Sequence, residues 1–181
     1  MDRQLQGDAW CFGGLLDVDW EICPRRVKEE LRQLRGGEPT DEDFGRYCMS
    51  VVDPTFAERV QRGDFLVGEV GFGYGHDHHH ACQSIKGSGV AAVLCDSATT
   101  YFMRNSLNLG LLVLEIPDIF AATTTGDALV VDVEQGLVTN TTTGWTGAFT
   151  KLPDFLLEIL DAGGVNHLLG RTAEPIKAGR E

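Results

Sequence analysis

The histidines of this chain are concentrated in one short segment. Four of the five fall within residues 76–80, directly after a turn at residues 71–75 that contains three glycines. Imidazole changes its charge close to neutral pH, so it can act as a general acid or base and as a metal ligand. A glycine-rich turn indicates a backbone that bends sharply or approaches a ligand closely. This segment is therefore the candidate site of chemistry.

The sequence predicts a helix over residues 81–86 that is closed by Gly87 or Gly89, and a start as early as His76 is left open. Its first turn would present free N–H groups and the positive end of the helix dipole, which bind a carboxylate or phosphate. A histidine at this position tends to stay neutral and can act as a base or as a ligand. On helical spacing His76 and His80 share a face, where they could chelate a metal ion. We favour acid–base chemistry, but a metal site and a merely solvated helix start capped by Asp77 remain open.

Other polar residues are weaker candidates. Asp17 and Asp19 either orient a catalytic group or are simply solvated. The densely basic helix expected at residues 24–35 is interpreted as a solvated face in preference to a surface that docks a partner or binds a substrate carboxylate. Arg104 lies in a predicted helix, where an ion-pair role competes with substrate binding.

Short apolar runs alternate with helical patterns along the first two thirds of the chain. Strands are expected at residues 9–12, 65–67, 90–94 and 111–116, and helices at residues 24–35, 40–51, 56–60, 81–86 and 98–109. This alternation predicts an α/β fold with a parallel layer. A hairpin at residues 128–133 and 137–140 and an amphipathic helix at residues 152–162 follow. We expect one domain over residues 1–170 and a polar tail over residues 171–181.

Composition limits the class of partner. The formal net charge is −12, which argues against nucleic acid or an anionic membrane surface. A small anionic substrate would need a locally positive pocket. The five cysteines form no C-x-x-C pair, so neither a disulfide framework nor an iron–sulfur or zinc site is expected in this chain. With no apparent export signal or membrane span, a cytoplasmic protein is expected, and a homo-oligomer is left open.

Several stretches, in this order and spacing, resemble a known family. They are Asp17-Val18-Asp19 with Ile22-Cys23-Pro24, Asp53-Pro54-Thr55-Phe56-Ala57, Gly63-Asp64, Phe102-Met103-Arg104-Asn105 through Gly110-Leu111, residues 132–144, and Leu152-Pro153-Asp154-Phe155 to Gly163-Gly164. On these residues nearly the whole chain resembles the small subunit of 3-isopropylmalate dehydratase, the swivel domain of the aconitase superfamily.

The resemblance implies a fold, a partner and a reaction. The fold is a layered β/α/β swivel domain with a central, partly parallel sheet. The partner is an aconitase-like large subunit that holds a [4Fe–4S] cluster, which agrees with the lack of cluster cysteines here. The reaction is a dehydration and rehydration that moves a hydroxyl between neighbouring carbons of a small, malate-type carboxylic acid.

The active-site loop departs from the family pattern N-F-G-C-G-S-S-R-E-H-A. Tyr74 stands at the cysteine, His76 and Asp77 at the two serines, and His78 at the arginine. His79 replaces the glutamate, while His80 and Ala81 keep the family residues. An imidazole lacks the bidentate carboxylate grip of a guanidinium, but at neutral pH it is a better base than an unaided hydroxyl.

The resulting hypothesis is a specialised hydro-lyase or isomerase subunit. His76 would be the base, Asp77 would orient it, and His78 and His80 would contact substrate. Further substrate contacts are expected from the following residues: Gly73, Tyr74, Gly75, His79 and Arg104. The alternative is a domain that works without a large subunit, either as a stand-alone enzyme that uses histidine and aspartate, with or without a metal, or as a non-catalytic metal-binding module.

Overall fold

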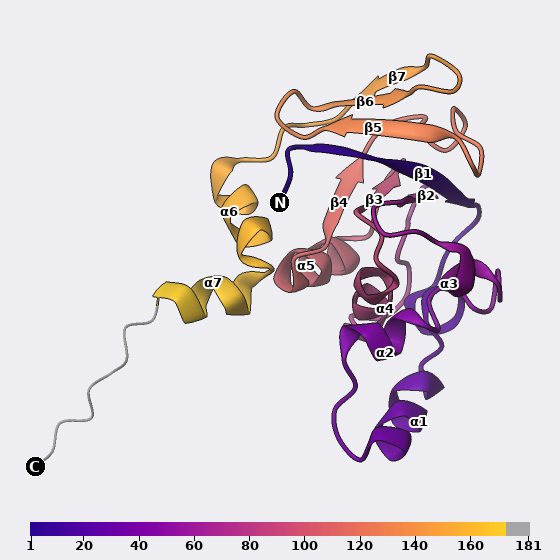
Figure 1. Ribbon diagram of the computed structural model, residues 1–181, viewed down its shortest axis with the longest axis vertical. Coiled ribbons are helices and arrows are strands. Elements are labelled where there is room, and N and C mark those ends of the chain that lie inside the picture. The colour runs from indigo at the N-terminus through magenta and orange to yellow at the C-terminus, as the bar shows by residue number, and fades with distance from the viewer. Residues whose placement is uncertain (173–181) are drawn as a thin grey trace, which may run out of the picture.

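A computed structural model of the chain describes residues 1–172. Its strands form one sheet in the order β4-β3-β2-β1-β5-β6-β7 (Figure 1). The strands are β1 (Gln4–Phe12), β2 (Phe65–Gly68), β3 (Ala92–Cys95), β4 (Leu112–Glu115), β5 (Ala128–Asp132), β6 (Leu137–Asn140) and β7 (Thr146–Ala148). The helical segments are the π-helical turn η1 (Val18–Ile22), then α1 (Arg26–Arg35), α2 (Asp41–Gly45), α3 (Phe56–Arg59), α4 (His80–Ser88), α5 (Thr100–Leu109), α6 (Asp154–Ala162) and α7 (Val165–Thr172).

The sheet has a parallel half and an antiparallel half that meet at β1. β1 to β4 run parallel, because each is connected to the next by helical segments that return the chain to the same end. β5 pairs antiparallel with β1, and β6 and β7 follow by tight turns. The expected α/β fold with a partly parallel central sheet is confirmed.

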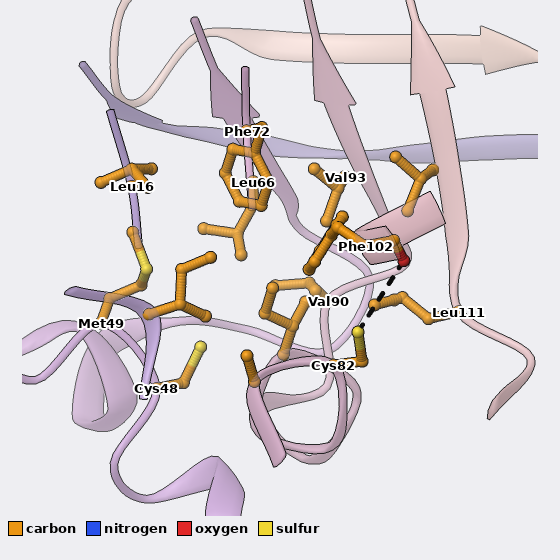
Figure 2. Packing of buried hydrophobic residues seen from close by; sticks show 14 of the residues in the cluster. Leu16, Cys48, Met49, Leu66, Phe72, Cys82, Val90, Val93, Phe102 and Leu111 are labelled. Carbon is orange, nitrogen blue, oxygen red and sulfur yellow. Dashed lines mark hydrogen bonds between the residues drawn. The ribbon is translucent and has the colours of Figure 1, made fainter. Parts of the chain in front are cut away.

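The central parallel strands β2 and β3 are buried on both of their faces. In β2, Leu66 packs with the helices, whereas Phe65 and Val67 pack against the antiparallel strands, as the twofold alternation of a strand requires. Figure 2 shows the helix side, where Leu66 and Val93 of the sheet meet Cys82 of α4 and Phe102 of α5. The apolar core therefore fixes α4, and with it the histidine segment, against the sheet.

Some boundaries differ from those predicted. β7 lies in a stretch that was expected to contain only turns. This segment has a weak strand propensity, and it forms a strand because it pairs with β6. A seventh α-helix, α7, follows Gly163 and Gly164, and it includes Arg171 and Thr172, which were assigned to the tail. The remainder of the predicted tail, residues 173–181, lies outside the described residues. Over residues 1–172, no helix combines the length and apolar character needed to cross a membrane.

Candidate functional site

The histidine segment lies at the carboxyl end of the parallel strands. The loop that carries it follows β2, and its two neighbours are the segments that follow β1 and β3. On one side Val18 N–H donates to the Tyr74 carbonyl at 2.8 Å. On the other, Phe72 N–H donates to the Ser97 carbonyl at 3.0 Å, and the Thr99 hydroxyl donates to the Gly73 carbonyl at 2.7 Å. In open parallel sheets this edge is where ligands bind.

Glycines are required where the loop passes close to its neighbours. Gly75 has a φ of +109°, and a Cβ there would lie 2.7 Å from Oδ2 of Asp17. Gly73 has a φ of +74°, and its Cβ would lie 2.3 Å from the Phe102 side chain. Both the backbone conformation and the available space therefore exclude larger residues. The glycine turn brings the histidine segment against the residues that follow β1.

Asp17 and Asp19 have different positions in that neighbouring segment. Asp17 caps η1, because its carboxylate accepts a hydrogen bond of 2.7 Å from the Asp19 N–H. Asp19 itself is buried, with only 7% of its side chain exposed. The sequence left open whether either acid orients a catalytic group. The structure brings Asp19 to the histidines.

Three histidines converge on the Asp19 carboxylate. Nδ1 of His78 lies 2.8 Å from Oδ1 and 3.0 Å from Oδ2. Nδ1 of His76 lies 3.3 Å from Oδ2, and Nε2 of His80 lies 3.6 Å from Oδ1. The rings of His76 and His78 stack at a centroid separation of 5.5 Å, so both present the same edge to the acid.

The partners of these rings determine where their protons sit. A carboxylate accepts hydrogen bonds, so Nδ1 of His78 carries a proton, and in the neutral form of the ring Nε2 keeps a free lone pair. Nε2 of His80 donates to the Cys23 carbonyl at 2.9 Å, and burial lowers the pKa of His80, which keeps that ring neutral. The side chain of His80 is 4% exposed, that of His78 is 34% exposed and that of His76 is 72% exposed. His76 and His78 are therefore the two rings accessible to a ligand.

The helix expected at residues 81–86 is confirmed, but it does not extend back to His76. α4 begins at His80, and His79 is its N-cap residue without a side-chain capping bond. Asp77 does not cap this helix. The carboxylate that lies close to His76 belongs to Asp19 and not, as expected, to Asp77. The Asp77 backbone carbonyl accepts a 2.9 Å hydrogen bond from the Asn105 amide, which ties the loop to α5. His76 and His80 are brought together by a shared acid and not by helical spacing.

Basic residues at the start of α1 surround the histidines. Arg25 and Lys28 line a cavity of about 290 Å³ together with Asp77, His78, His79 and His80. A second cavity, of about 380 Å³, is lined by Arg25 and Arg26 together with Asp19, Trp20, Pro24 and His76. Arg25 thus borders both cavities. Arg25, Arg26 and Lys28 are exposed, as expected of a solvated face, and their place beside the histidines agrees equally with the carboxylate-binding alternative.

The remaining candidate residues have structural positions of different kinds. Gly73 and Gly75 shape the loop as described, and the Tyr74 ring is exposed while its backbone pairs with η1. Arg104 lines a different cavity, between α5 and α6, among apolar residues such as Leu107 and Leu156. The structure does not place Arg104 with the histidines.

Comparison with known proteins gives consistent matches. Residues 25–119 match the family model described as the aconitase C-terminal domain. The chain is 35% identical to the isopropylmalate/citramalate isomerase small subunit of Methanocaldococcus jannaschii, over 89% of this chain and 90% of that protein. It is 32% identical to the 2,3-dimethylmalate dehydratase small subunit of Eubacterium barkeri, over 93% of this chain and 98% of that protein. A crystal structure of 3-isopropylmalate dehydratase from M. jannaschii superposes with a TM-score of 0.82 at 27% identity, covering 93% of this chain and 95% of that one.

Proposed function

Because the chain belongs to the aconitase C-terminal domain family, we propose that it is the small subunit of a hydro-lyase or isomerase that acts on a malate-type hydroxy acid. Its relatives are named as small subunits of enzymes for isopropylmalate, citramalate and dimethylmalate. These compounds share a hydroxyl and two carboxylates on adjacent carbons and differ in their alkyl substituents. The proposal therefore fixes the substrate class and leaves the alkyl group open.

The observation that carries this proposal is the hydrogen bond between His78 and the buried Asp19. Dehydration requires a base that removes the proton next to a carboxylate. With Nδ1–H held by Asp19, Nε2 of His78 is free to accept that proton, and the carboxylate stabilises the imidazolium that forms. The electron pair of the broken C–H bond forms the C=C bond as the hydroxyl leaves. Although His76 stands at the family's serine, the hydrogen bond to Asp19 is made by His78, which favours His78 as the base, with His76 beside it against the substrate.

The cationic residues near the histidines support binding of the substrate carboxylates. The loop lacks the family's arginine, but Arg25 and Lys28 share a cavity with His78, His79 and His80. A guanidinium binds a carboxylate through two parallel hydrogen bonds, whereas an imidazole supplies one. In this proposal, Arg25 therefore binds a substrate carboxylate in place of the arginine of the family's loop. The overall charge of −12 makes such a local positive site necessary for an anionic substrate.

The [4Fe–4S] cluster of the superfamily belongs to the partner in this proposal. All five cysteines of the chain are free thiols, and burial raises the pKa of Cys23, Cys48, Cys82 and Cys95 to about 12. Cluster ligation needs several cysteines around one point, and within the described residues no three cysteines lie at ligand distance from one another. When bound in the large subunit, the cluster would act as a Lewis acid toward the substrate hydroxyl. This chain would supply the base and part of the carboxylate site.

The proposal is tested by isolating the native complex. The chain is purified anaerobically from its source, and its partners are identified by mass spectrometry together with their iron and sulfide content. We expect a stoichiometric large subunit with a cluster, and a complex that converts at least one of isopropylmalate, citramalate or dimethylmalate to an unsaturated acid detected by ultraviolet absorbance. Recovery of the chain alone, or of a complex inert toward every malate-type acid, would overturn the proposal.

A further inference from the structure

The Asp19 carboxylate lacks the kind of partner that a buried acid normally has. Within residues 1–172 its ion-pair partners are the three imidazoles of His76, His78 and His80, and no lysine or arginine pairs with it. A buried carboxylate needs compensation by a cation or by several hydrogen bonds. Imidazoles provide a full positive charge only when protonated, so a metal cation is the alternative source of charge.

Three donor atoms around Asp19 lie close enough together to be candidate metal ligands. One oxygen of Asp19 and one ring nitrogen each of His76 and His78 all lie within 4.8 Å of one another. An ion about 2.0–2.2 Å from each ligand needs them to be at most about 4.2 Å apart. The His76 side chain is 72% exposed, so its ring has room to turn toward the other two ligands. The separation of 3.3 Å between His76 Nδ1 and Asp19 Oδ2 already fits two ligands of one ion.

We propose that Asp19, His76 and His78 bind a divalent transition-metal ion. The donors are one carboxylate oxygen and two imidazole nitrogens, a set that suits Zn²⁺, Co²⁺, Ni²⁺ or Fe²⁺ and is poor for Mg²⁺ or Ca²⁺. Three protein ligands leave at least one position open, as in catalytic sites and unlike closed structural ones. Asp19 and His76 also line the cavity of about 380 Å³, whose Arg25 and Arg26 favour an anion as the additional ligand.

Neighbouring side chains are excluded as ligands by their own contacts. His80 uses Nε2 to donate to the Cys23 carbonyl, which only a protonated nitrogen can do. Cys23 is fully buried and does not belong to the group of donor atoms that lie close together. His79 lies at the N-cap of α4 and lines the other cavity, next to Arg25 and Lys28. The ligand set is thus limited to Asp19, His76 and His78.

Metal binding and base chemistry exclude each other at this site. An ion on Nδ1 of a neutral His78 places the proton on Nε2, which removes the lone pair that accepts a substrate proton. The ion is therefore an inhibitor of the proposed reaction, and this consequence, unlike the binding itself, rests on the proposed function. The activity of the complex would then depend on the concentration of free metal ion as well as on that of substrate.

The experiment titrates the purified full-length chain with Co²⁺ and follows its visible absorption, with Zn²⁺ added afterwards as a competitor. We expect one equivalent of Co²⁺ per chain, with bands that Zn²⁺ abolishes. His76→Ala and Asp19→Asn should each weaken binding by more than the roughly 10–100-fold that loss of a supporting residue costs. His167→Ala, which removes an exposed histidine on α7, is the matched control and should bind normally. Because His76 is exposed, its variant should fold normally even if Asp19→Asn does not.

Two results would overturn the metal site: no Co²⁺ binding by the wild-type chain, or unchanged affinity in both His76→Ala and Asp19→Asn. A second measurement adds Zn²⁺ to the active complex, where we expect loss of turnover that a chelator restores. Turnover that is insensitive to saturating Zn²⁺ would contradict the mutual exclusion. If the chain binds Co²⁺ but no complex shows turnover, the metal site stands and the proposed function fails.

Discussion

Nδ1 of His78 lies 2.8 Å from Oδ1 of Asp19, across 59 residues of sequence. The two residues meet because the segments after β1 and β2 reach the same edge of the parallel sheet, where Val18 and Tyr74 join their backbones. The resulting arrangement is a buried acid, an oriented imidazole and a free nitrogen facing a cavity. In the proposed function, this arrangement makes His78 the base.

Replacing Asp19 with Asn tests the orientation of His78. The amide can donate to Nδ1, which would move the proton to Nε2 and leave no base. We predict that kcat of the active complex falls by between about 10²- and 10⁴-fold, with KM little changed. Steady-state kinetics with Asp154→Asn, an exposed acid on α6, as control provides the measurement. An undiminished kcat in Asp19→Asn would show that Asp19 does not orient the base.

Replacing Arg25 with Gln tests the carboxylate grip. Arg25 borders both cavities next to the histidines. A charge-assisted hydrogen bond contributes about 1.5–3 kcal/mol, so we predict that KM rises by roughly 10–100-fold while kcat changes less. Arg35→Gln, at the other end of the same helix, where the side chain pairs with Asp43, should retain the wild-type KM. Equal KM values for the two variants would remove Arg25 from substrate binding.

Replacing Gly75 with Ala tests the close approach of the loop to η1. The added Cβ would lie 2.7 Å from the Asp17 carboxylate in a backbone with a φ of +109°. Gly14→Ala is the matched control, because Gly14 also has a positive φ, +82°, but nothing within 4 Å of its Cβ. We predict that Gly75→Ala lowers the free energy of unfolding by about 1–3 kcal/mol more than Gly14→Ala does. Urea unfolding curves measure both, and equal losses would contradict the steric explanation.

Stability in acid should depend on Asp161. Hydrogen bonds from Arg3 and the N-terminal amine lower the pKa of Asp161 from 3.8 to about 2. A depressed folded-state pKa stabilises the protein above the unfolded-state value, and this stabilisation is lost as the pH falls toward the folded-state value. We therefore predict that the urea midpoint of the wild type falls more steeply between about pH 5 and pH 2 than that of Asp161→Asn. Equal slopes for the two proteins would indicate that the hydrogen bonds to Asp161 do not contribute to stability in acid.

The fold could be predicted largely because its signals are local. Buried strands such as β2 and β3 are compact apolar runs bounded by turn residues, and α5 ends at a glycine in the left-handed conformation. β7 and α7 escaped prediction because β7 depends on pairing with β6, and α7 begins directly after two glycines that indicated an end of structure.

The site could be predicted only in part. The histidine run drew attention to a segment that the structure places at the carboxyl edge of the parallel strands, but helical spacing was the wrong basis for relating His76 to His80, since α4 begins at His80. Their proximity depends on Asp19, which lies on a distant segment and has no periodicity linking it to the loop. For the same reason the sequence could not relate Arg25 to the histidines. The two segments are brought to one cavity only in the folded chain.

The most direct test of the proposed chemistry is kcat of the reconstituted complex with His78→Ala, measured at saturating malate-type substrate and compared with His167→Ala. We predict that His78→Ala loses about 10²–10⁴-fold in kcat while its circular dichroism and its association with the large subunit remain unchanged. His167→Ala should retain wild-type turnover. A His78→Ala complex that assembles normally and turns over at the wild-type rate would contradict the role of His78 as the base.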